Sequence, residues 1–424
     1  MFVRHWSVVL AFAFNTAACT EGEPSVSDES QDLLLDERVD QIRNDFPIPN
    51  SAGIAASWHP DGFVNLSNAF FTPQGRNGRH CGSCHAPEDG WSINPSTVER
   101  MFLSTDGTHP IFSILDADRP TADLSTVSAR WNAFSMLRQG KFTRKVSPPA
   151  TRDYDVIAAS DPFGVGTTSS LWFFRRPLPT ANFKSHTVMW DAANTVGTDL
   201  IAGLDRQARG NVTGAQQGAP ASNAVIHEIV TFEAGLAHAQ TFLQGVGRLD
   251  VDGGRGGPQG ASEQPLVAGR FDLYDAWRTS TPKRRQVYRG QEIFNNVNVA
   301  SGRRCGSCHN AANSGQNVAG TLFDVGASRP ELANADMAVY TFRRRSDGAL
   351  LTSTDPGRGI RSGKFADLNK FKTPSLRGLA ARAPYFHNGV AADLRAVVEI
   401  YERTLGFVFT EQEKDDLVAF MSAL

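Results

Sequence analysis

The amino-acid sequence predicts a mainly α-helical protein in two halves, with small β-hairpin insertions. Helical spacing is clearest near the C-terminus, where Leu394, Val398 and Tyr401 fall on one apolar face. The motif C-x-x-C-H occurs once in each half, at residues 81–85 and 305–309. Short runs of β-branched and aromatic residues, bounded by glycine and proline, interrupt the helical pattern and predict strands.

The length and charge of the chain exclude several classes of protein. Its 424 residues suffice for two domains, and 42 Lys and Arg against 44 Asp and Glu give a net charge of −2. A protein that binds nucleic acid would show a basic excess or patch, so we expect no nucleic-acid partner. The sequence contains no run of about 18 apolar residues, and it therefore predicts no membrane-spanning segment.

Residues 1–19 have the pattern of an export signal, with a basic start at Arg4, an apolar stretch and small residues before Cys19. This pattern resembles a bacterial lipoprotein signal, in which the cysteine is acylated; ordinary signal cleavage nearby is the alternative. We expect a periplasmic protein whose only membrane contact is a lipidated Cys19. Residues 20–45 are acidic and polar, which predicts a solvated tether.

The two C-x-x-C-H motifs contain four of the five cysteines. In such a motif two thiols add to the vinyl groups of heme, and the adjacent histidine coordinates the iron. A redox dithiol would not need the histidine, and a four-cysteine zinc site would not place its halves so far apart in the chain. The sequence therefore predicts two covalently bound heme c groups, attached through Cys81, Cys84, His85, Cys305, Cys308 and His309.

Each motif lies in its own half, and both halves resemble cytochrome c domains. We place an N-terminal c-type heme domain at residues 46–275, with an insertion near 140–185, and a C-terminal c-type heme domain at residues 276–424. Strand-like runs are Val156–Ala159 and Leu171–Phe174, and a hairpin is expected from Tyr340–Phe342 and Leu350–Thr352. Thr410 and Glu413 form a capping box that predicts the start of a last helix.

Three segments carry a family resemblance. Lys372–Arg377 and Ala383–Gly389 resemble the C-terminal signature of bacterial di-heme cytochrome c peroxidases and their MauG relatives, and Val188–Asp191 is similar to their tryptophan-aspartate motif. The resemblance implies that the N-terminal heme reacts with hydrogen peroxide and that the C-terminal heme delivers electrons. It also implies that Trp190 relays electrons between the hemes, and that the donor is a protein such as a small cytochrome c or a cupredoxin.

The resemblance implies further metal ligands. A calcium ion would lie between the hemes, bound by Asn132 and by the carbonyl oxygens of Arg382 and Pro384, because hard oxygen ligands suit calcium. Tyr401 stands where the peroxidases have a methionine that ligates the second heme, and MauG-type proteins have a tyrosine there. Since Tyr401 also completes an apolar helix face, core packing is the alternative.

The sequence departs from the family at the distal acid. Peroxidases carry a glutamate beyond the tryptophan, whereas residues 209–217 contain no carboxylate and Gln217 takes the acid's place. An amide cannot move a proton as a carboxylate does. Glu228 and Glu233 follow, but we interpret both as helix surface. We expect a di-heme peroxidase-type oxidoreductase, with MauG-like oxidation of another substrate, or electron transfer without peroxidase activity, as alternatives.

Overall fold

The computed structural model describes residues 40–259, 269–299, 301–310, 314–317 and 320–424. Cys19 and most of the predicted tether lie outside these residues. None of the helices in the described part of the chain is both long and apolar enough to cross a membrane.

Helices are the commonest regular elements, and most are short. The α-helices are α2 (Pro95–Thr105), α3 (Val127–Ala133), α4 (Ser135–Arg138), α5 (Leu200–Thr213), α6 (Asn223–Gly235), α8 (Pro282–Asn296), α9 (Cys305–Cys308), α10 (Gly359–Ser362), α11 (Leu394–Leu405) and α12 (Glu411–Ser422). Single 3₁₀ turns are η1 (Ala69–Phe71), η2 (Cys81–Ser83), η3 (Pro87–Asp89), η4 (Ile114–Asp116), η5 (Asp275–Thr279), η7 (Pro330–Leu332), η8 (Phe365–Asp367) and η9 (Leu379–Ala381).

The strands form small antiparallel sheets. They are β1 (Gln41–Arg43), β2 (Ile48–Asn50), β3 (Gly53–Trp58), β4 (Phe63–Asn65), β5 (Phe142–Val146), β6 (Tyr154–Ser160), β7 (Leu171–Arg175), β8 (Ala237–Leu243), β9 (Gly247–Arg248), β10 (Val339–Arg344) and β11 (Leu350–Ser353). The sheet orders are β1-β4, β2-β3-β8-β9, β5-β7 and β11-β10-β6. The predicted β10–β11 hairpin is confirmed, as are the strands at β6 and β7.

Two features of the sheets differ from the sequence prediction. The strands β1 to β5, β8 and β9 were not predicted, in part because segments such as β3 (GIAASW) are short and rich in alanine. The strand β6 pairs with β10 and not with its neighbour β7, with Ser160 opposite Val339 and Tyr154 opposite Arg344. A strand from the insertion therefore joins the hairpin of the C-terminal half.

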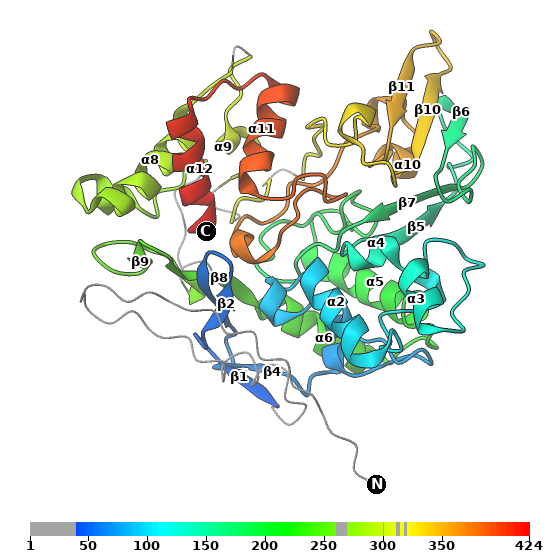
Figure 1. Cartoon of the computed structure of the whole chain (residues 1–424), viewed down its shortest axis with the longest axis horizontal. Coiled ribbons are helices and arrows are strands. Elements are labelled where there is room, and N and C mark those ends of the chain that lie inside the picture. The colour runs from blue at the N-terminus through cyan, green and yellow to red at the C-terminus, as the bar shows by residue number, and fades with distance from the viewer. Residues whose placement is uncertain (1–39, 260–268, 300, 311–313, 318–319) are drawn as a thin grey trace.

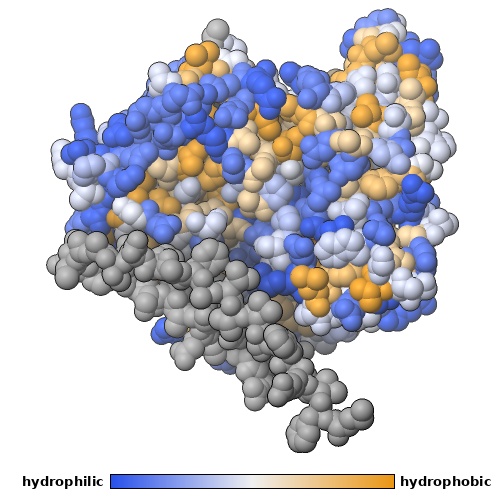
Figure 2. Space-filling model, viewed as in Figure 1, coloured by the Kyte–Doolittle hydropathy of each residue, from blue (hydrophilic) through white to orange (hydrophobic). Residues whose placement is uncertain are grey.

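Figure 1 shows α8, α11 and α12 on one side of the molecule and α2 to α6 on the other, with β6, β10 and β11 at a corner. On the face in Figure 2, hydrophobic residues form small groups among hydrophilic ones, including at the corner where the β10–β11 hairpin lies. Leu350, at the start of β11, has 64% of its surface exposed.

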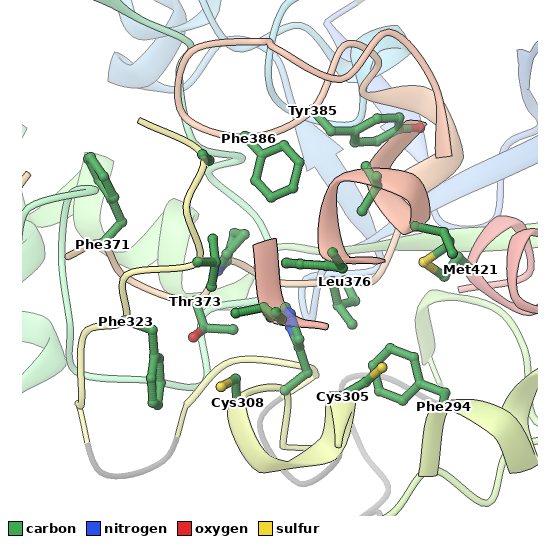
Figure 3. A pocket seen from close by; sticks show the side chains of 18 of the residues that line it. Phe294, Cys305, Cys308, Phe323, Phe371, Thr373, Leu376, Tyr385, Phe386 and Met421 are labelled. Carbon is green, nitrogen blue, oxygen red and sulfur yellow. The ribbon is translucent and has the colours of Figure 1, made fainter. Parts of the chain in front are cut away.

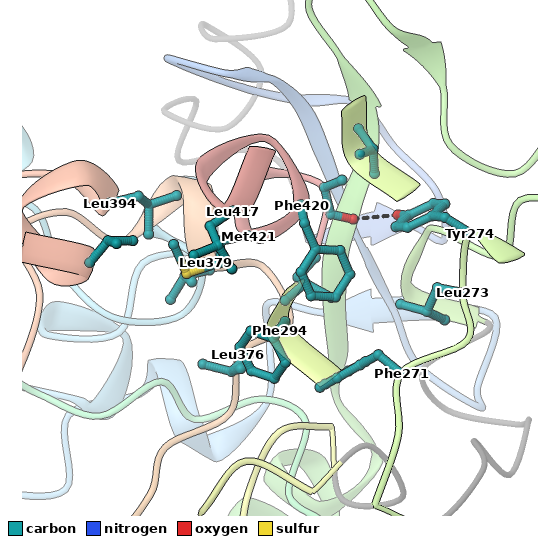
Figure 4. Packing of buried hydrophobic residues seen from close by; sticks show 14 of the residues in the cluster. Phe271, Leu273, Tyr274, Phe294, Leu376, Leu379, Leu394, Leu417, Phe420 and Met421 are labelled. Atoms are coloured by element: carbon teal, nitrogen blue, oxygen red, sulfur yellow. Dashed lines mark hydrogen bonds between the residues drawn. The ribbon is translucent and has the colours of Figure 1, made fainter. Parts of the chain in front are cut away.

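The C-terminal core is built around α8 and α12, which cross at close range. A Cβ added at Gly290 of α8 would come within 1.9 Å of the Asp416 carbonyl oxygen, so this crossing requires glycine. Phe271, Phe294 and Phe420 meet edge to face beside it (Figure 4). The predicted capping box of α12 is confirmed, since the Thr410 side chain accepts from the Glu413 N–H.

Candidate functional site

The two C-x-x-C-H motifs each open onto a pocket. Cys305, Cys308 and His309 line a pocket in the C-terminal half, and Cys81, Cys84 and His85 line one in the N-terminal half. The empty volume of each pocket, including its opening to solvent, is about 1370 Å³ in the C-terminal half and about 1440 Å³ in the N-terminal half. Each pocket is lined by side chains from many segments of the chain, so it is more than a local gap beside its motif.

The histidines of the two motifs are held in the same way. His85 donates its Nδ1–H to the Trp91 carbonyl at 3.0 Å, and His309 donates to the Gly315 carbonyl at 3.0 Å. Each acceptor is six residues beyond its histidine. Because a carbonyl can only accept, Nε2 of each ring keeps its lone pair for a metal. Burial lowers the pKa of His309 to about 4 and also lowers that of His85, which favours neutral imidazoles.

The two loops that carry the cysteines share the same local hydrogen bond. The backbone N–H before each motif, at His80 and at Arg304, donates to the serine of that motif at 3.1 Å. Burial raises the pKa of the Cys84 and Cys305 thiols to about 12. A redox dithiol has a lowered thiol pKa, so this environment argues against that alternative. Two cysteines beside a neutral imidazole that faces a pocket fit a covalently attached heme.

The walls of the C-terminal pocket are largely apolar. In Figure 3, Cys305 and Cys308 lie on one side of the cavity with Phe294, and Tyr385 and Phe386 lie across from them. Such a lining suits a large apolar group.

The N-terminal pocket is far more polar. Its wall includes arginines, lysine and three amides, namely Arg79, Arg144, Arg175, Arg176, Lys372, Gln207, Asn211 and Gln216. Arg79 is paired with Asp116 at 2.6 Å. This lining suits a pocket that admits water or a small polar reactant.

Gln217, the predicted counterpart of the distal acid, does not line this pocket in the described structure. It follows the end of α5 and adopts a left-handed backbone with φ 56°. The preceding residue, Gln216, faces the pocket instead: its amide lies 3.9 Å from the Cys81 sulfur and donates to Asn211. An amide therefore lines this wall, but it belongs to Gln216 and not to the predicted Gln217.

Glu233 was interpreted as helix surface, and this was wrong. It is 3% exposed and lines the N-terminal pocket, where its Oε1 accepts from the Thr180 hydroxyl at 3.0 Å. The Thr180 N–H donates to the same Trp91 carbonyl that holds His85, so Glu233 lies on the histidine side of the pocket. Burial raises its pKa to about 7. Ile226, Ile229 and Val230 precede it at helical spacing, a pattern that indicates its buried face.

Replacing Glu233 with glutamine should flatten the pH dependence of stability. Because the folded pKa lies above the ordinary 4.5, the proton on Glu233 stabilises the fold at low pH, and this contribution disappears as pH rises through 7. We expect the free energy of unfolding of the wild type to fall by about 3 kcal/mol more than that of Glu233→Gln between pH 4.5 and 8.

Urea unfolding of the two proteins across this pH range measures the difference. Asp89, whose pKa burial also raises to about 7, contributes equally to both proteins and cancels. Glu228→Gln, at an exposed position on the same helix, is the matched control and should follow the wild type. Parallel curves for all three proteins would contradict the prediction.

Trp190 lines both pockets. Its indole N–H donates to the Arg176 carbonyl at 2.8 Å, and its own carbonyl accepts from the Lys372 N–H at 2.8 Å. Its ring meets that of His387 edge to face at 6.2 Å. The predicted bridging residue is therefore positioned between the pockets by segments from both halves of the chain.

Asp191, the partner of Trp190 in its motif, anchors this bridge in a buried charge cluster. It is 0% exposed and accepts from Arg175 at 2.8 Å and from Arg361 at 3.2 Å. Arg175 also forms a two-point pair with Asp355, at 2.6 and 2.8 Å. The arginines hold the pKa of Asp191 well below its ordinary value against the opposing effect of burial.

Tyr401, on α11, lines the C-terminal pocket, and so does Met421 of α12. The Tyr401 ring meets Phe386 edge to face at 5.5 Å. Burial raises the pKa of its hydroxyl, and the nearby Cys305 and Cys308 add to this effect. Tyr401, the predicted sixth iron ligand, is therefore in the pocket, and the thioether of Met421 lines it as well.

No contact given for the described residues brings the predicted calcium ligands together. Asn132 is exposed on α3, and among the described residues no hydrogen bond or ring contact joins it to the segment 382–384. The Arg382 carbonyl accepts from the guanidinium of Arg176 at 3.3 Å. Asn94 is the asparagine nearest this segment, since its amide donates to the Ala381 carbonyl at 2.7 Å. The structure thus gives no support for Asn132, Arg382 and Pro384 as a calcium site, and this set stays a prediction.

Comparisons with known proteins match parts of the chain. Cytochrome-c peroxidase IdrP1 of Denitromonas iodatirespirans is 30% identical over 173 residues, covering 36% of this chain and 44% of that protein. Cytochrome c551 peroxidase of Nitrosomonas europaea is 31% identical, and methylamine utilization protein MauG of Paracoccus denitrificans is 30% identical; each match covers 32% of this chain and 34% of the relative. The chain thus spans less than half the length of these relatives.

No family model matches the sequence. Among solved structures, a MauG-like protein associated with microbial copper homeostasis aligns with a TM-score of 0.37 at 18% identity, covering 62% of this chain and 78% of that one. The sequence matches confirm the resemblance to the di-heme cytochrome c peroxidase and MauG superfamily.

Proposed function

We propose that this protein is an exported di-heme c-type oxidoreductase in which peroxide meets the N-terminal pocket and electrons arrive through the C-terminal pocket. The observation that carries the proposal is the position of Trp190, which lines two pockets with the same cysteine and histidine arrangement. Heme in each pocket would supply iron that exchanges electrons and, where its second face is open, reacts with peroxide.

The residues of this chain have separate tasks in the proposal. Cys81 and Cys84, like Cys305 and Cys308, fix the orientation of the group in each pocket. His85 and His309 each present Nε2 as a ligand, because their Nδ1–H is committed to a backbone carbonyl. Trp190 is held at three points, through its indole N–H, its carbonyl and its ring, which preorganises the bridge.

The partners follow from this arrangement. The proposed oxidant is hydrogen peroxide, and the proposed electron donor is a small cytochrome c or a cupredoxin. Hemes of the c type are attached outside the cytoplasm, so we place the protein in the periplasm, with Cys19 as its lipid anchor.

A second candidate, electron transfer without peroxide turnover, is favoured by the acid groups of the N-terminal pocket. The carboxylates that line it among the described residues are Asp116, which is paired with Arg79, and Glu233, which lies on the histidine side. The remaining wall offers amides, which do not move a proton as a carboxylate does.

The position of Tyr401 favours a third candidate, MauG-like oxidation of another substrate.

Stoichiometric addition of hydrogen peroxide to the purified, reduced holoprotein separates these candidates. If the proposal holds, stopped-flow absorbance shows oxidation of both hemes within one reaction, and Trp190→Phe slows the oxidation of the C-terminal heme without changing the heme content. In a separate assay, a reduced small cytochrome supplied together with excess peroxide is oxidised continuously. Two hemes that remain reduced in peroxide would favour the electron carrier and reject the peroxidase.

Replacing Tyr401 with phenylalanine tests its role as an iron ligand. Loss of a phenolate ligand should change the ferric absorption and electron paramagnetic resonance spectra of one heme only, because the other pocket is untouched. Tyr385→Phe is the matched control, since Tyr385 lines the same pocket and its hydroxyl donates to the Leu379 carbonyl at 3.1 Å. If Tyr401→Phe leaves the spectra unchanged, Tyr401 is a core residue and not a ligand.

A further inference from the structure

The guanidinium of Arg176 lies in a cage of backbone carbonyls next to the bridge between the pockets. The residue is 3% exposed. Its Nη2 donates to the carbonyl oxygens of Ile93 at 2.7 Å, Arg382 at 3.3 Å and Ala383 at 3.4 Å, and its Nη1 donates to that of Gln139 at 3.4 Å. These acceptors come from three segments far apart in the sequence, so the side chain joins them.

The cage is closed around the side chain. A Cβ added at Gly140 would lie 2.4 Å from Nη1 of Arg176, and one added at Gly389 would lie 3.2 Å from its Cδ. Gly140 also has φ 69°, so glycine is required there for two reasons. The absence of side chains at Gly140 and Gly389 therefore leaves room for the Arg176 side chain on both sides.

A calcium ion and this guanidinium would compete for one place. Carbonyl oxygens are the hard ligands that calcium prefers, and the Arg382 carbonyl is one of the ligands that the family resemblance assigns to it. In this structure that carbonyl is taken by Arg176. The side chains of Arg382 and Lys141 bring positive charge nearby, and the Asp89 carboxyl faces the guanidinium with the opposite charge. Burial lowers the pKa of Arg176 to about 10, so it remains a cation at neutral pH.

The backbone of Arg176 connects this cage to both pockets. Its N–H donates to the His387 carbonyl at 2.7 Å, and His387 lines the C-terminal pocket. Its carbonyl accepts from the Trp190 indole at 2.8 Å. A residue whose side chain is fixed by four carbonyls thus fixes, through its own backbone, the ring that lies between the pockets.

We propose that Arg176 is a built-in cation that replaces an inter-pocket calcium ion and positions Trp190, so that this protein assembles its two-pocket bridge without calcium. The inference does not rest on the proposed oxidoreductase activity, because charge, carbonyl geometry and the contact with Trp190 carry it. In this assignment Arg176 is a positioning residue and touches no reactant.

The first test is made on the wild-type holoprotein. Isothermal titration with calcium should show no saturable binding, and a chelator such as EGTA should leave the unfolding midpoint unchanged. Binding of one calcium ion per chain, or a loss of stability in the chelator, would overturn the proposal. This measurement needs no variant, so it stands even if the variants fail to fold.

The second test separates charge from shape. Arg176→Met keeps much of the length and removes the cation, and Arg176→Lys keeps the cation. We expect Arg176→Met to lower the unfolding midpoint and Arg176→Lys to recover most of the loss, with calcium leaving the lysine variant unaffected. If the methionine variant is as stable as the lysine variant, a cation is not needed in the cage and the proposal fails.

Discussion

Replacing Arg175 with methionine should lower the free energy of unfolding by about 3–5 kcal/mol, because it leaves buried carboxylates without their partner. Arg175 is bonded to both Asp191 and Asp355, whose side chains are 1% and 2% exposed. Arg361, at 3.2 Å, would still reach Asp191, but Asp355 would lose its two-point pair. Urea unfolding at neutral pH measures the loss.

The pH dependence of this loss has a defined sign. The arginines depress the folded pKa of Asp191 below its ordinary 3.8, so its contribution is present above that pH and disappears as the pH falls further. The difference between wild type and Arg175→Met should therefore be largest near neutrality and shrink in acid.

Arg248→Met is the matched control for this prediction. Arg248 and Asp250 form an exposed pair, with side chains 69% and 46% accessible, and such pairs contribute about 0–1 kcal/mol. If both variants lost the same free energy of unfolding, the buried cluster would stabilise the fold no more than an exposed ion pair does, which would contradict the prediction. Because the same cluster anchors Asp191 next to Trp190, Arg175→Met should also disturb the bridge between the pockets.

Replacing Cys305 and Cys308 together with serine should remove one covalently attached heme. Intact mass after denaturation should fall by one heme relative to the wild type, and the pyridine hemochrome absorbance per chain should fall by half. The empty apolar pocket should also destabilise the C-terminal core, since Leu376, Leu394 and Met421 lose a packing partner.

The matched variant carries serine at Cys81 and Cys84. It should lose the other heme and keep the one held by Cys305 and Cys308, because the two pockets are separate. A wild-type chain that carries fewer than two hemes, or a double variant that keeps both, would contradict the attachment chemistry on which the proposed function depends.

The parts of the site that the sequence could reveal are local in the chain. The C-x-x-C-H spacing, the capping box at Thr410 and the β10–β11 hairpin each involve residues close together, so short-range chemistry predicts them. Glu233 could also have been found, since it follows Ile226 and Val230 on one helix face. It was missed because a glutamate on a helix is usually at the surface.

Other parts of the site depend on contacts between distant segments. The bond from Arg176 to the Arg382 carbonyl joins residues 206 apart in the sequence. Gln216 lines the pocket where Gln217 was predicted. Which of the two side chains faces inward depends on how the chain turns after α5, where Gln217 has a left-handed backbone. Neither spacing nor residue type gives such information.

The pairing of β6 with β10 has a consequence for how the chain matures. An edge strand without a partner is a site for aggregation, and β6 lacks its partner until residues 339–344 have been synthesised. Both cysteine motifs precede those residues in the chain. Every attachment cysteine therefore precedes the partner of β6 in the chain, and a fragment that ends before β10 would leave the pairing edge of β6 exposed.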